Sequence, residues 1–227
     1  KQKTAYEIST RDWSSDVCSS DLTGIDGDLA AVASEIGATV LVNDDPDDLR
    51  AAVSNALAQT GDRAAVLICH GTAATCSKHW WQQGVADCHI GVVACTFTPQ
   101  VLAALAVHDL QKPFADNVAA MAAAAAAVRC AHITATGPLS DHGGSSPATW
   151  ALPAWESGTS ASVLEALAYV GGRLLDPQSE VVTVILGPDA GVSAADAAAV
   201  LAEVAPGCEV TVLASAVAGT TVTIGVE

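Results

Sequence analysis

Cysteine and histidine residues cluster in one short part of this sequence. Six of them fall between positions 69 and 89. Thiolates and imidazoles are the ligands that zinc prefers, usually in a tetrahedral set of four. Cys76 and His79 are separated by two residues, a spacing that allows both side chains to bind one metal ion. We therefore predict a zinc site formed by Cys69, His70, Cys76 and His79.

The same cluster also fits a structural interpretation without metal. The sequence lacks the paired Cys-x-x-Cys motifs of most structural zinc sites. Cys69 ends an apolar run that reads as a strand, and Cys88 precedes another such run. Cysteine often serves as a small buried residue at such positions. Because the ends of parallel strands share one edge of a sheet, some of these residues would converge without metal, so both interpretations stay open.

Motifs for phosphate binding or nucleophilic catalysis are absent or incomplete. The chain has no P-loop, no Gly-x-Gly-x-x-Gly and no Gly-x-Ser-x-Gly sequence. Asp141, His142 and Ser145 resemble a catalytic triad in composition only, since close neighbours in sequence cannot easily adopt its geometry. Asp26 and Asp28 lack the further acids that a magnesium site needs, and we expect a helix cap there. The sequence therefore predicts no catalytic or cofactor-binding residue, and whether the chain is an enzyme stays open.

Apolar runs that alternate with amphipathic segments predict the fold class. Strands are expected at residues 39–42, 64–69, 90–94, 132–136, 181–186, 209–213 and 221–226. Helices are expected at residues 46–59, 98–107, 115–129, 160–175 and 193–204. This alternation is typical of βαβ units, so we expect an α/β fold with a mainly parallel sheet flanked by helices. The Gly-, Ser- and Pro-rich stretch 137–158 predicts a long loop or a hairpin.

The first 22 residues do not fit this pattern. Residues 1–8 and 12–22 read as the translation of the two halves of a common sequencing adapter. We interpret residues 1–22 as an adapter-derived artefact and exclude them, so we expect the sheet to lack its first strand. The remainder is long enough for a sizeable core. We predict an α/β lobe at residues 23–109 and a second α/β lobe with C-terminal strands at residues 110–227.

The chain is strongly acidic, with a formal net charge of −16 at pH 7. Such a charge repels phosphate backbones and anionic membrane surfaces, so we expect no nucleic-acid partner. No uninterrupted apolar run reaches the roughly 20 residues that cross a bilayer, so no membrane insertion is expected. The cysteines form no short disulfide framework, which favours a cytoplasmic location.

Tryptophan is conspicuous in a chain whose aromatic content is 4%. It occurs as the pair Trp80-Trp81 and again at Trp150 and Trp155. Large aromatic side chains dominate both cores and interfaces. We favour core packing, and an exposed tryptophan at an interface is the alternative.

Several stretches, taken in order, carry a family resemblance. The last third contains Leu174-Leu175, the run 180–187, Pro206-Gly207-Cys208-Glu209-Val210 and Ile224-Gly225-Val226-Glu227. The earlier part contains Glu35-Ile36-Gly37-Ala38, Thr98-Pro99-Gln100, Asn117-Val118, Met121 and the run 128–134. Together they resemble the C-terminal region of the fatty acid kinase catalytic subunit, within the dihydroxyacetone-kinase-like family, over residues 27–227. The chain departs from the family at Val42-Asn43-Asp44-Asp45-Pro46, where a Gly-Gly-Gln-containing turn is usual.

The resemblance implies a DegV-like fold and a bacterial protein of lipid metabolism. It implies a non-catalytic domain that docks a fatty-acid-binding partner protein or forms a homodimer. ATP and magnesium would bind to a separate N-terminal domain of the parent protein, and no cofactor is expected in this part. The alternative is a free-standing α/β fatty-acid binder, or a metal-dependent enzyme that uses the Cys/His residues.

Overall fold

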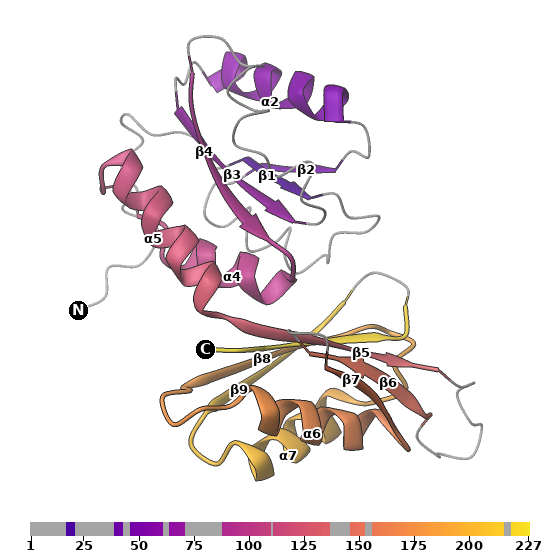
Figure 1. The fold of residues 1–227 in the computed structure, drawn as a ribbon. Coiled ribbons are helices and arrows are strands. Elements are labelled where there is room, and N and C mark those ends of the chain that lie inside the picture. Colours follow the sequence, from indigo (N-terminus) through magenta and orange to yellow (C-terminus); the bar gives the residue numbers. More distant parts are fainter. Residues whose placement is uncertain are drawn as a thin grey trace. The chain divides into compact units, whose positions relative to one another are not determined.

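The computed structural model describes residues 17–20, 39–42, 46–60, 64–70, 88–109, 111–136, 146–152, 156–215 and 219–227. These residues form two compact units (Figure 1). The first unit holds the described residues between positions 17 and 96, together with Val101–Ala126. The second holds Phe97–Gln100 and the described part of Ala127–Glu227. Whether the folding domains divide after residue 109 stays a prediction.

The first unit is built on a parallel sheet of the order β2-β1-β3-β4 (Figure 1). Its strands are β1 (Val17–Ser20), β2 (Thr39–Val42), β3 (Ala64–His70) and β4 (His89–Cys95). Its helices are α2 (Pro46–Thr60), α4 (Thr98–Ala106) and α5 (Phe114–Ala127). The first three residues of α4 and the last residue of α5 belong to the second unit.

Both faces of strands β3 and β4 are apolar, because helices pack on each. Leu67 and Ile90 belong to one core cluster with residues of α2. Ile68 and Val93 belong to the cluster on the other face, with residues of α4 and α5 such as Met121. Parallel sheets are buried on both faces in this way, which explains why these strands read as continuous apolar runs.

The expectation that this sheet lacks its first strand is wrong for the structure. Val17–Ser20 forms β1, which pairs in parallel with β2 on one side and β3 on the other. The edges of β2 and β3 offer backbone donors and acceptors that must be paired, and a short stretch of any strand-competent sequence can meet that need. Whether residues 1–22 derive from an adapter stays a prediction.

The second unit contains a mixed sheet of the order β7-β6-β5-β10-β8-β9 (Figure 1). Its strands are β5 (Arg129–Ala135), β6 (Ala148–Ala151), β7 (Ser157–Ser160), β8 (Val181–Leu186), β9 (Glu209–Ala214) and β10 (Thr221–Val226). Its helices are α6 (Val163–Leu174) and α7 (Ala194–Val204). All neighbouring strands are antiparallel except β8 and β9.

The prediction of an α/β fold flanked by helices is confirmed, but the prediction of a mainly parallel sheet is wrong for this unit. Only β8 and β9 are joined through a helix, α7, and only they are parallel. The short connection between β6 and β7 can form only a hairpin, because a parallel pair needs a longer crossover. The C-terminal strand β10 then inserts between β5 and β8, antiparallel to both.

The core of this unit lies between one face of the sheet and helices α6 and α7. Ile133, Val184 and Ile224 point to that face and are fully or almost fully buried with Leu167 and Leu201. Ser162 caps α6, where its hydroxyl accepts a hydrogen bond from the Glu165 N–H at 3.0 Å. A Cβ on Gly171 of α6 would lie 2.9 Å from a methyl group of Leu201, so glycine lets the two helices approach closely. Across the described residues, no helix combines the length and apolarity needed to cross a membrane.

Candidate functional site

The predicted zinc ligands fall only partly within the described residues. Cys69 and His70 are the last two residues of β3, where they lie opposite Ala94 and Cys95 of β4. Cys76 and His79 lie outside the described residues. Among the described residues, no group of three or more His, Cys, Asp or Glu side chains could hold a metal ion. The four-residue zinc site therefore stays a prediction, and the Asp26/Asp28 and Asp141/His142/Ser145 groups also lie outside the described residues.

The strand register separates the remaining members of the Cys/His cluster. His89 begins β4 opposite Ala64, at the start of β3, whereas His70 is six positions further along β3. At a rise of about 3.3 Å per residue, His70 and the His89 backbone are about 20 Å apart along the sheet. Cys88 directly precedes β4 and so lies at the same end as His89. Because the two pairs lie at opposite ends of parallel strands, the six residues do not share one edge.

An aromatic patch in the second unit carries the most distinctive exposed chemistry among the described residues. We define this aromatic patch as Trp150, Glu156, Tyr169 and Arg173. Tyr169 and Arg173 are four residues apart on α6 and therefore lie on one face of the helix. Trp150 comes from β6, and its ring centroid lies 4.9 Å from that of Tyr169. Tyr169 is 45% exposed, so the patch presents an aromatic surface to solvent.

Glu156 fixes the polar side of the aromatic patch. Its carboxylate accepts a hydrogen bond from the Tyr169 hydroxyl at 3.3 Å through Oε1 and one from Arg173 at 3.0 Å through Oε2. The hydrogen bond and the negative charge of Glu156 both raise the pKa of the Arg173 guanidinium. An exposed ion pair adds little to stability. Its effect here is to hold the tyrosine and arginine side chains in one arrangement before any partner binds.

A glycine on the edge strand positions the tryptophan. Trp150 lies directly opposite Gly158 in the β6–β7 pair. A Cβ at position 158 would lie 2.5 Å from the indole ring, so only glycine allows the ring to lie over the strand. No described strand pairs with the outer edge of β7, which therefore offers backbone groups next to the patch. Trp150 also packs against the core, so both interpretations offered for tryptophan apply to this residue.

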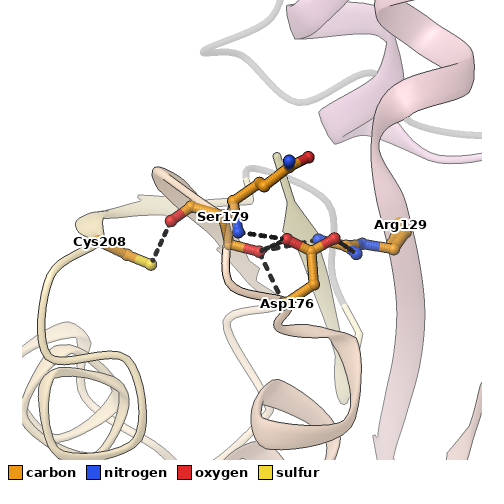
Figure 2. A network of polar contacts seen from close by, with 5 residues as sticks. Arg129, Asp176, Ser179 and Cys208 are labelled. Carbon is orange, nitrogen blue, oxygen red and sulfur yellow. Dashed lines mark hydrogen bonds and ion pairs between the residues drawn. The ribbon is translucent and has the colours of Figure 1, made fainter.

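A second polar network ties together the strand ends at another part of the unit (Figure 2). Arg129, at the start of β5, forms an ion pair with Asp176 and donates a hydrogen bond to the Ser179 hydroxyl at 2.8 Å. Ser179 also accepts, through its carbonyl oxygen, a hydrogen bond from the Cys208 thiol at 3.3 Å. The hydrogen bond from Arg129, followed by that from the Gln178 N–H, lowers the pKa of Asp176. These groups satisfy one another, so the network reads as structural.

Cys130 is a poor candidate for thiol chemistry. It lies on β5 and is 2% exposed. Burial, followed by the nearby charge of Glu227, raises the pKa of the Cys130 thiol to about 12. A thiol that stays protonated at neutral pH is neither a good nucleophile nor a ready metal ligand.

Solved structures define the fold class of this chain. A DegV family protein from Corynebacterium glutamicum aligns with a TM-score of 0.62 at 9% identity, covering 94% of this chain and 97% of that one. A hypothetical protein from Thermotoga maritima, described as revealing a fatty acid binding function, aligns with a TM-score of 0.63 at 8% identity, with coverages of 94% and 99%. The fatty acid kinase B3 protein from Streptococcus pneumoniae, loaded with linoleic acid, aligns with a TM-score of 0.58 at 11% identity, with coverages of 95% and 99%. The chain therefore has the DegV fold.

The family follows from the sequence itself. Residues 24–137 match the FakA-like C-terminal family of fatty acid kinases. The match spans half of the chain, and the chain belongs to this family. This confirms the resemblance read from the ordered motifs. No curated protein sequence matches the chain.

Sequence reasoning missed Tyr169 and Arg173, although a signal was present. Both occupy exposed positions of a helix whose other face is strongly apolar. An aromatic residue followed four positions later by arginine, on the polar face of an amphipathic helix, is the pattern that would have found them.

Proposed function

We propose that this chain is a non-catalytic docking domain of an ATP-dependent, fatty-acid-kinase-like protein, and that it binds the partner protein that carries the fatty acid. Membership of the FakA-like C-terminal family is the observation that carries the proposal. In this proposal, ATP and magnesium bind to another domain of the parent protein, and the protein works in the cytoplasm of a bacterium.

The aromatic patch is the surface to which we assign docking. Tyrosine, tryptophan and arginine are the residue types that most often dominate binding energy at protein interfaces. Here Trp150, Tyr169 and Arg173 lie together, held by Glu156, beside the outer edge of β7. Because their side chains are already ordered, binding would cost less conformational entropy than ordering free side chains.

Isothermal titration calorimetry with the fatty-acid-loaded DegV-fold protein from the same genome tests this assignment. Tyr169→Ala removes the exposed ring and is expected to weaken binding by at least about 2 kcal/mol, roughly thirtyfold in Kd. Ala202→Gln, at an exposed position of α7, is the matched control and should leave the affinity unchanged. Equal binding by the Tyr169→Ala variant and the wild type would remove the patch from the interface.

Homodimer formation through the same patch is an alternative outcome of this test. Light scattering of the purified chain distinguishes it. A dimer that Tyr169→Ala converts to a monomer would assign the patch to a second copy of this chain. A monomer at all concentrations would leave hetero-association as the use of the patch.

A second candidate function is direct fatty-acid binding by this chain. The fold likeness favours it, because the Thermotoga maritima and Streptococcus pneumoniae structures are described as a fatty-acid binder and a linoleic-acid-loaded protein. Extraction of the purified chain and mass spectrometry of the extract decides between the two. A stoichiometric fatty acid supports a binder, whereas an empty chain that still binds the loaded partner supports docking.

Metal-dependent chemistry at the Cys/His cluster requires its own test. The proposed zinc site predicts about one zinc ion per chain in protein purified without chelator, measured by elemental analysis. Loss of that zinc in a Cys76→Ser, His79→Gln double variant would assign it to the predicted ligands. A zinc content near zero in the wild type excludes the site.

A further inference from the structure

A short turn at the start of α4 is held on the sheet of the second unit. The turn is Phe97–Gln100, which belongs to the second unit although the chain on both sides of it belongs to the first. It is closed on itself, since the Phe97 N–H donates to the Gln100 side-chain Oε1 at 3.2 Å and the Gln100 N–H donates to the Phe97 carbonyl at 3.0 Å. We therefore treat the turn as one structural piece.

Two contacts attach this turn to strands β5 and β10. Pro99 packs on Gly225 so closely that a Cβ at position 225 would lie 2.4 Å from the proline Cβ. The Phe97 ring lies against the His132 imidazole, with centroids 4.6 Å apart and planes tilted by 54°. His132 is opposite Thr223 in the β5–β10 pair, and its Nδ1 lies 3.0 Å from the threonine hydroxyl.

Among the described residues that face His132, none carries a charge that would stabilise a protonated imidazole. These residues are Thr223 on β10, Ala151 on β6 and Phe97 on the turn, and none of them titrates in the range of histidine. On its own strand, Cys130 stays a neutral thiol because burial raises its pKa to about 12. Burial lowers the pKa of His132 below its ordinary value of 6.5. Since His132 keeps an exposed surface, protons can still reach it from solvent.

We propose that His132 is a pH-sensitive latch that holds the Phe97–Gln100 turn on the sheet while the imidazole is neutral and loosens it when the imidazole is protonated. With the ring neutral, Nδ1 accepts a hydrogen bond from the Thr223 hydroxyl, and Phe97 packs against an uncharged ring. Protonation turns Nδ1 into a donor, breaks that hydrogen-bond arrangement and places a charge in a partly desolvated position. The weak attraction between a cation and the Phe97 ring does not outweigh that cost, because the net shift opposes the charged form.

The test is a pH titration of the whole chain followed by NMR. The His132 ring signals and the Phe97 amide and ring signals are expected to change together, with one midpoint below 6.5. In a His132→Gln variant, the Phe97 signals should lose this transition. His89→Gln, at an exposed position of β4, is the matched control and should keep it.

A second variant keeps the proposal testable if His132→Gln perturbs the fold. Phe97→Leu removes the ring that covers the imidazole and is expected to move the His132 midpoint up toward 6.5. Phe97 signals that do not follow the His132 titration in the wild type would overturn the latch. An unchanged His132 midpoint in Phe97→Leu would also overturn it.

Discussion

In the first unit helices pack on both faces of a parallel sheet, whereas in the second unit α6 and α7 pack on one face of a mixed sheet. The strands of the first unit consequently carry apolar residues on both faces, as parallel strands covered by helices must. The strands of the second unit alternate, so that Ile133 and Ile224 enter the core while His132 and Thr223 point to the other face. Distinctive polar chemistry among the described side chains therefore gathers in the second unit.

The largest effect is expected from the core of the second unit. Leu201 of α7 is fully buried against α6 and the sheet. Leu201→Ala removes buried surface and leaves a cavity, which is expected to lower the free energy of unfolding by about 2–5 kcal/mol. Chemical denaturation checks this value. If the second unit owed its order to the first rather than to its own core, the loss would be much smaller.

A smaller loss is expected where Pro99 packs on Gly225. Gly225→Ala places a methyl group 2.4 Å from the Pro99 Cβ and 3.1 Å from a methyl group of Val128. The overpacking should lower the free energy of unfolding by about 1–3 kcal/mol. Gly172→Ala on α6 is the control, because a Cβ there meets nothing within 4 Å. The control should be neutral or stabilise the helix by up to about 1 kcal/mol, and equal losses in both variants would contradict the close contact.

The smallest effect concerns the Arg129–Asp176 pair at the exposed strand ends. Its hydrogen bonds lower the pKa of Asp176 from 3.8. A carboxylate with a lowered pKa in the folded state stabilises the fold above its unfolded pKa and loses that contribution as the pH falls through the folded pKa. The stability difference between wild type and Asp176→Asn should therefore shrink as the pH is taken below 3.8.

Denaturation at a series of pH values measures this difference. Glu203→Gln, at an exposed position of α7, is the control for the loss of one negative charge. A difference that stays constant with pH for Asp176→Asn would show that the ion pair does not form.

Local sequence patterns predicted the last third of the chain closely. The predicted strands 181–186 and 221–226 match β8 and β10, and the predicted helix 193–204 matches α7 within one residue. Alternating apolar residues and capping serines such as Ser162 and Ser193 are local signals that need no tertiary contact.

Features set by long-range pairing were less predictable. Arg129 was expected to end a helix, but it begins β5 because the chain there pairs with β10. The sheet of the second unit is mixed because β10, far away in sequence, inserts between β5 and β8. The aromatic patch joins Trp150 on β6 to Tyr169 on α6, a proximity that only the folded chain creates. Motif order nevertheless identified the family before the fold was known.

The measurement that bears on the central proposal is NMR mapping of this chain against the fatty-acid-loaded partner protein. We expect the perturbed amide and side-chain signals to concentrate around the aromatic patch and β7, on residues such as Trp150, Gly158, Tyr169 and Arg173. Perturbations confined to α2, α4 and α5 of the first unit, with the patch unchanged, would contradict the assignment of docking to the second unit.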